Sequence, residues 1–149
     1  MDRNLVYDSI DWHTAADGFP SEVPWENGGT HIAMFLAWYM SKDLLSAAFS
    51  SQHSSDIAKI KNRELKPRSF LIEHCNKEIS SDFFSEEGNA FAEHYYKKYL
   101  VDYAGILGRH APSIYHAPDS WKVYDLVQPS IEQRFKDWKS GKKWWQVWK

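Results

Sequence analysis

The chain has 149 residues, of which 16% are aromatic and 26% are charged, and its formal net charge is −2. This composition is typical of one globular domain with a sizeable core, and it excludes a disordered chain. Because the net charge is negative, the chain as a whole has no positive charge with which to bind nucleic acid. The charge is unevenly placed, because residues 134–149 carry +5 and the remaining residues therefore carry −7. Such an acidic body could steer a basic partner.

Cellular location can be inferred from the cysteine content and the N-terminal sequence. Cys75 is the only cysteine, so no intramolecular disulfide can form, and a reducing compartment is indicated. The N-terminus, MDRNLVYDSIDWH, lacks the apolar stretch of a signal peptide, and no apolar run is long enough to span a membrane. We therefore expect a cytoplasmic protein without membrane contact.

The first 26 residues hold scattered apolar and aromatic side chains, with two prolines, Pro20 and Pro24. Residues 5–7 could form a short strand. The rest is expected to be an ordered segment that aromatic side chains hold against the core.

Residues 31–40, HIAMFLAWYM, are expected to form the element around which the chain folds. Nine of these ten residues are apolar or aromatic. A helix that is apolar all round has no face for solvent, so the remaining elements must enclose it. The helix is predicted to start with Asn27 or Thr30 as its cap and to continue through Leu45.

The middle of the chain is predicted to contain two shorter helices. A polar loop over residues 50–55 precedes a helix over residues 57–65, for which Asp56 is the expected cap. Pro67 then ends that helix or begins the next, and residues 69–76 are predicted to be helical. Residues 79–84 are expected to form a turn.

The clearest helical pattern covers residues 86–107. Phe91, Tyr95, Tyr99 and Ile106 recur every three to four residues, or multiples of that spacing, and Gly108 provides a stop. After a loop over residues 109–120, a further helix is expected to have Pro129 in its first turn and to end at residues 139–141. The basic, tryptophan-rich residues 142–149 are expected to fold back onto the core.

Together these patterns predict a mainly α fold. We expect a single compact helical domain over residues 1–149, built around a buried central helix, with at most a small N-terminal β element.

No catalytic motif is present. The seven histidines lack metal-ligand spacing, since the closest two are six residues apart, and no metal site or cofactor is predicted. Cys75 is interpreted as a core residue. A nucleophile elbow, a phosphate-binding loop and a dinucleotide fingerprint are all missing from the sequence, so no catalytic residues are assigned and the chain is not expected to be an enzyme.

His31 has two interpretations because it begins the apolar helix. The favoured one is a buried histidine that is hydrogen-bonded to Asp8, Asp11 or a backbone carbonyl. The alternative is a small-ligand or enzyme pocket near His31. The residues of this possible pocket are Trp12, His13, His31 and Asp102.

Three motifs carry a resemblance to a known family: Y-D-x-x-x-W-H at residues 7–13, H-I-x-M-F-L-A-W at residues 31–38 and F-x-x-x-Y-Y-x-x-Y-L-x-D-Y at residues 91–103. With Trp121 and Trp138, they resemble a family of small bacterial cytoplasmic proteins without an assigned catalytic activity. Proteins of this type are similar to the immunity partners of polymorphic or contact-dependent bacterial toxins. The resemblance implies an antitoxin-like protein that occludes the active site of a cognate toxin, for which a nuclease is one candidate.

The N-terminal segment is the predicted partner-binding region, because its acids alternate with tryptophans that often anchor interfaces. The predicted partner-binding residues are Asp8, Asp11, Asp17, Glu22, Trp25 and Glu26. Direct binding of nucleic acid through residues 142–149 is disfavoured by the net negative body. The sequence does not indicate an oligomeric state.

Overall fold

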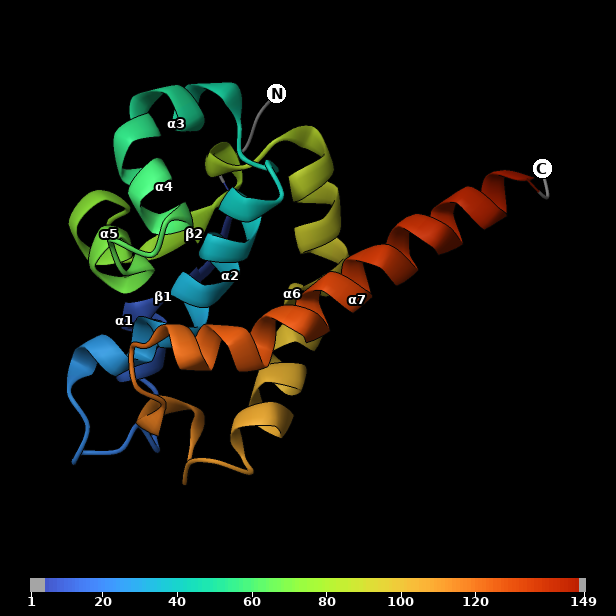
Figure 1. Cartoon of the computed structure of the whole chain (residues 1–149). Helices are drawn as coiled ribbons and strands as arrows, with labels where there is room; N and C mark the ends of the chain where they lie inside the picture. The colour runs from blue at the N-terminus through green and yellow to red at the C-terminus, as the bar shows by residue number, and fades with distance from the viewer. Residues whose placement is uncertain (1–4, 148–149) are drawn as a thin grey trace.

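The structure, a computed structural model, describes residues 5–147, and side chains are described for residues 5–141 (Figure 1). The helices and strands are β1 (Val6–Ser9), α1 (Ile10–Thr14), η1 (Trp25–Gly29), α2 (Thr30–Ser41), α3 (Ala47–Gln52), α4 (Ser54–Lys61), α5 (Pro67–His74), β2 (Glu78–Ser80), η2 (Ser81–Phe83), α6 (Glu86–Leu107), η3 (Ile114–His116) and α7 (Trp121–Val147). The predicted mainly α fold with a small N-terminal β element is confirmed.

The central helix α2 is buried along nearly its whole length, as its apolar sequence predicts. Every residue from Thr30 to Met40 is buried, and α4, α5, α6, α7 and β2 all pack around it. The helix ends at Ser41, so the predicted extension to Leu45 is wrong. Asp43 adopts a φ of 60°, which lies in the left-handed region and cannot continue a right-handed helix.

The start of α2 is held by packing rather than by a side-chain cap. Gly29 is the N-cap residue and makes no side-chain hydrogen bond, so the predicted caps, Asn27 and Thr30, are wrong. Their side chains instead accept hydrogen bonds from Nη1 of Arg68, at 2.8 and 3.2 Å. A Cβ atom at Gly29 would lie 2.5 Å from Cδ1 of Ile10, so only glycine permits this close approach of α1.

The two strands form an antiparallel pair in which Asp8 lies opposite Ile79. The register shifts between Val6 and Asp8, which marks a bulge. Strand β1 therefore covers residues 6–9 rather than the predicted 5–7. Part of the turn expected over residues 79–84 is occupied by β2 and η2. Helix α1 follows β1 directly, and the Ser9 hydroxyl caps it by accepting a hydrogen bond from the Asp11 amide.

The helices between α2 and β2 are shifted relative to their predictions. Helix α3 occupies part of the expected polar loop because the Ser46 hydroxyl caps it at the Phe49 amide. Helix α4 starts two residues before the expected cap Asp56 and ends at Lys61. Helix α5 confirms the helix expected after Pro67, and this proline stands in its first turn.

Helix α6 spans Glu86–Leu107, the predicted range. The Ser85 hydroxyl accepts a hydrogen bond from the Gly88 amide at 3.0 Å, and Gly108 is the C-cap. The aromatic stripe faces the core, and both Phe91 and Tyr99 are fully buried.

Helix α7 runs without a break from Trp121 to Val147, so the prediction of a helix that starts at Pro129 and ends near Gly141 is wrong. The lost backbone hydrogen bond at Pro129 is offset by contacts on both sides of it. Val127 and Ile131 are buried, and Glu132 binds Lys42 at 2.7 Å. The helix packs on α2 and α6 and then extends beyond them (Figure 1).

The prediction that residues 142–149 fold back onto the core lies outside the part of the chain whose side chains the structure describes. Among residues 5–147, no helix combines the length and the apolar character that crossing a membrane requires.

Candidate functional site

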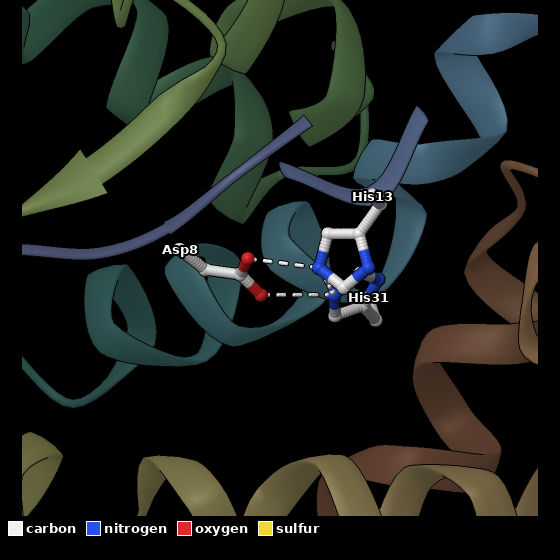
Figure 2. Close-up of side chains that lie close together, drawn as sticks. All are labelled: Asp8, His13 and His31. Atoms are coloured by element: carbon white, nitrogen blue, oxygen red, sulfur yellow. Dashed lines mark hydrogen bonds and ion pairs between the residues drawn. The ribbon is translucent and has the colours of Figure 1, made fainter. Parts of the chain in front are cut away.

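Three polar side chains from separate elements converge beside the N-terminus of α2 (Figure 2). Asp8 comes from β1, His13 from α1 and His31 from the first turn of α2. The bulge in β1 and the immediate start of α1 set the direction of the first two side chains. The packing of Ile10 against Gly29 holds both elements against the start of α2. We call these three residues the Asp–His–His cluster.

The three side chains are within hydrogen-bond distance of one another. Nε2 of His13 lies 2.8 Å from Oδ1 of Asp8, and Nε2 of His31 lies 3.0 Å from Oδ2. The two Nε2 atoms are 3.1 Å apart. The side chain of His31 is fully buried and that of Asp8 nearly so, whereas the His13 side chain is 15% exposed. The cluster therefore reaches the surface only through His13.

The Asp8 carboxylate accepts two further hydrogen bonds. The Ser9 amide donates to Oδ1 at 2.8 Å and the Tyr96 hydroxyl donates to Oδ2 at 2.5 Å. Burial alone would raise the pKa of the Asp8 carboxyl, but the hydrogen bonds from His13, His31 and Tyr96 outweigh burial and hold this pKa well below its ordinary value. Asp8 is thus a buried carboxylate, and no lysine or arginine in the described part of the chain is bound to it.

The two imidazoles differ at Nδ1. Nδ1 of His13 lies 2.6 Å from the Tyr115 hydroxyl. Nδ1 of His31 is buried without a hydrogen-bond partner among the described residues, and so is the hydroxyl of Tyr103, whose ring centroid lies 5.7 Å from that of His31. Burial lowers the pKa of His31, which outweighs the opposite effect of Asp8 and keeps this imidazole neutral.

This donor set could bind a metal ion. The ligand atoms of Asp8, His13 and His31 all lie within 4.8 Å of one another. A neutral imidazole and a carboxylate are ordinary ligands of divalent transition metals, and either histidine could also exchange a proton with Asp8. The favoured interpretation of His31 as a buried histidine bonded to Asp8 is confirmed by the hydrogen bond between them.

Asp102 lies apart from this cluster. Its carboxylate accepts hydrogen bonds from Nε and Nη2 of Arg134, at 2.9 and 3.0 Å, and from the Tyr95 hydroxyl at 2.7 Å. These contacts join α6 to α7 and keep the pKa of Asp102 low despite burial, which acts in the opposite direction. The predicted four-residue pocket is therefore divided. The partners of Asp102 are Tyr95 and Arg134, and neither belongs to that predicted pocket.

Trp12, the remaining residue of the predicted pocket, is 55% exposed on α1. Trp25 is 45% exposed on η1, which packs against α1. Nζ of Lys77 lies 3.2 Å from Oδ1 of Asp11 and 5.5 Å from the centre of the Trp25 ring. We call the exposed side chains of Asp11, Trp12 and Trp25, together with the half-buried Lys77, the tryptophan surface.

The predicted partner-binding acids differ in exposure. Asp8 is buried in the Asp–His–His cluster and cannot meet a partner, which corrects its assignment. Asp17 and Glu22 are exposed, and Glu26 is half-buried. Glu22 accepts a hydrogen bond from Nε2 of His116 at 2.8 Å.

Sequence reasoning missed the cluster as a unit because its residues are separated by five and eighteen positions, unlike the short spacings of metal motifs. It also missed Tyr96 and Tyr115, which bind Asp8 and His13. One signal was present: Asp8, His13 and His31 are all polar residues within the mainly aromatic and apolar motifs at residues 7–13 and 31–38.

A protein-family model described as "Domain of unknown function (DUF7832)" matches residues 6–117. This range contains the whole cluster and the tryptophan surface, and it ends before α7. No curated protein and no solved structure matches the chain.

Proposed function

We propose that this chain, which belongs to the DUF7832 family, is a protein-binding protein of the immunity type that neutralises a cognate bacterial toxin by covering its active site. The single observation that carries the proposal is the tryptophan surface. Two large aromatic side chains are exposed on neighbouring elements, and both lie within the N-terminal segment where partner binding was expected.

Exposed tryptophans suit a binding role because they provide large contact areas and are enriched at the centres of interfaces. Trp12 and Trp25 belong to elements held by the core, since α1 follows β1 directly and Gly28 and Gly29 of η1 are buried. A surface that is already ordered loses little conformational entropy when it binds.

The charge around this surface supports a basic partner. Asp17 and Glu22 are exposed near it in sequence, and the chain outside residues 134–149 carries −7. An acidic surface would complement a toxin with a basic substrate groove, such as a nuclease, and would speed its association. Asp11 is paired with Lys77, and Glu22 with His116. A basic partner would therefore compete with Lys77 and His116 for these carboxylates at the edge of the interface.

The test is co-expression with the toxin that this proposal expects to be encoded beside this chain. Cells that produce both proteins should grow, and cells that produce the toxin alone should stop. Trp12→Ala and Trp25→Ala should each weaken binding of the purified toxin at least tenfold. Val101→Ser, which changes an exposed apolar residue of α6, should leave binding unchanged. If cells without this protein tolerate the toxin equally well, the proposal fails.

A further inference from the structure

The Asp–His–His cluster has three close polar contacts but too few protons for all three to be hydrogen bonds. Three contacts join the carboxylate and the two imidazoles, at 2.8, 3.0 and 3.1 Å. Each Nε2 atom of a neutral imidazole carries at most one proton, so at most two of the three contacts can be hydrogen bonds.

Every arrangement of protons on the two Nε2 atoms leaves one of the three contacts without a hydrogen bond. If both Nε2 atoms donate to Asp8, the two N–H groups meet at 3.1 Å. If one Nε2 atom instead accepts from the other, its lone pair faces a carboxylate oxygen across 2.8 or 3.0 Å. A cation bound between the three groups would accept a lone pair from each ligand, so none of the three contacts would then need a proton.

The distances suit such an ion. Zinc binds histidine nitrogen and carboxylate oxygen at about 2.0–2.2 Å, so ligands at 90–110° around it lie about 2.8–3.6 Å from one another. The separations in the cluster, in which Oδ1 of Asp8 faces His13 and Oδ2 faces His31, lie in the lower part of that range. Two imidazoles with one carboxylate form a donor set for first-row divalent metals and leave coordination positions open to water.

The surroundings would support the ligands. Nδ1 of His13 is 2.6 Å from the Tyr115 hydroxyl, which could accept a hydrogen bond from the N–H at this position when Nε2 binds a metal. The Ser9 amide and the Tyr96 hydroxyl hold the carboxylate, and they would orient it in the metal-bound state as well. A cation would also compensate the buried negative charge of Asp8.

We propose that Asp8, His13 and His31 form a binding site for one divalent first-row transition-metal ion, for which zinc is the probe. The site does not depend on the proposed toxin. It would tie β1, α1 and the start of α2 together. Because α1 also carries Trp12, the bound ion would fix one part of the tryptophan surface.

Zinc binding to the full chain tests this proposal. The protein is stripped with a chelator, exchanged into metal-free buffer and titrated with Zn²⁺ by calorimetry. We expect one equivalent to bind and the melting temperature to rise. His13→Gln removes the partly exposed ligand and should weaken zinc binding at least tenfold. Tyr115→Phe keeps all three ligands but removes the hydroxyl next to His13, and should weaken it about tenfold.

The matched control is His74→Gln. His74 also has a carboxylate, that of Asp56, 3.6 Å from its Nε2 atom, and His53 nearby, yet this trio is more exposed. Zinc binding should be unchanged in this variant. The proposal is overturned if the wild-type chain does not bind one equivalent, or if His13→Gln and Tyr115→Phe bind zinc as tightly as the wild type. It is also overturned if His74→Gln is the variant that loses binding. If His13→Gln fails to fold, the titrations of the wild type and of Tyr115→Phe still test the proposal.

Discussion

Asp8 and Asp102 are two carboxylates with low pKa values and opposite surroundings. Asp102 is bound by the guanidinium of Arg134 through two hydrogen bonds, and this pair lies partly in solvent between α6 and α7. Asp8 is buried and is bound by two histidines, a tyrosine and an amide. A permanent cation binds the first carboxylate, whereas no lysine or arginine in the described part of the chain binds the second.

The difference separates a structural contact from a candidate site. An ion pair such as that of Asp102 joins two helices, and its charge needs no further ligand to balance it. The carboxylate of Asp8 retains a buried negative charge with imidazole nitrogens beside it, which is an arrangement that a protein can use for a metal ion or a proton. Variants at these two positions test that contrast.

The largest effect is expected for Asp8→Ala in chelator-treated protein. The change removes the acceptor of His13, His31 and Tyr96, and leaves their donors buried without partners. We expect the free energy of unfolding to fall by about 3–5 kcal/mol. Urea denaturation measures this loss. A loss below about 1 kcal/mol would mean that the cluster contributes little to the fold.

Tyr96→Phe should have the next largest effect. Its hydroxyl donates to the buried Asp8 carboxylate, so its removal should cost about 2 kcal/mol. Tyr95→Phe is the matched variant, because the neighbouring tyrosine donates to Asp102, which keeps its bonds to Arg134. The cost there should be below about 1 kcal/mol. Equal costs for the two tyrosines in urea denaturation would contradict the contrast between the two carboxylates.

Arg134→Ala should have a smaller effect, of about 1 kcal/mol, because the ion pair with Asp102 is partly exposed and water replaces the lost cation. Thermal unfolding at low salt and in 1 M NaCl provides the check, since the salt should reduce the difference between this variant and the wild type. A difference that does not change with salt would show that Arg134 stabilises the helix contact by packing alone.

The smallest effect is the acid dependence that Asp102 contributes. Its pKa in the folded chain is below the ordinary value of 3.8, so its stabilising effect is present above that value. The effect is lost as the pH falls through the lowered folded pKa. Melting temperatures between pH 6 and pH 3 should therefore fall less steeply in Asp102→Asn than in the wild type. Parallel curves would indicate that this carboxylate has the same pKa in both states.

The elements that sequence reasoning predicted best are those with an uninterrupted pattern. Helix α6 was predicted over its whole length because its apolar residues recur at helical spacing between a serine cap and Gly108. Helix α7 was not predicted over its whole length, because a proline such as Pro129 is normally found in the first turn of a helix. Its continuity depends on the burial of Val127 and Ile131 and on the bonds that Glu132 makes to α2, and these contacts are tertiary.

The candidate site was predicted in part. A partner for His31 was expected, with Asp8 as one of three alternatives, because a buried polar group at the start of an apolar helix needs one. The contact with His13 was not expected, and Asp102 was placed with the wrong group. Its actual partner, Arg134, lies 32 residues away on another helix. No local spacing could reveal that pairing.

The sequence by itself determined that this is a mainly α protein around the buried helix α2, because a fully apolar helix can only exist inside a fold and burial follows from composition. Only the tertiary structure decided which polar groups meet at the N-terminus of that helix. Asp8, His13 and His31 converge because a bulge in β1, the cap of α1 and the missing side chain of Gly29 bring three elements together. Such a convergence depends on packing directions in space, and residue types along the chain do not specify these directions.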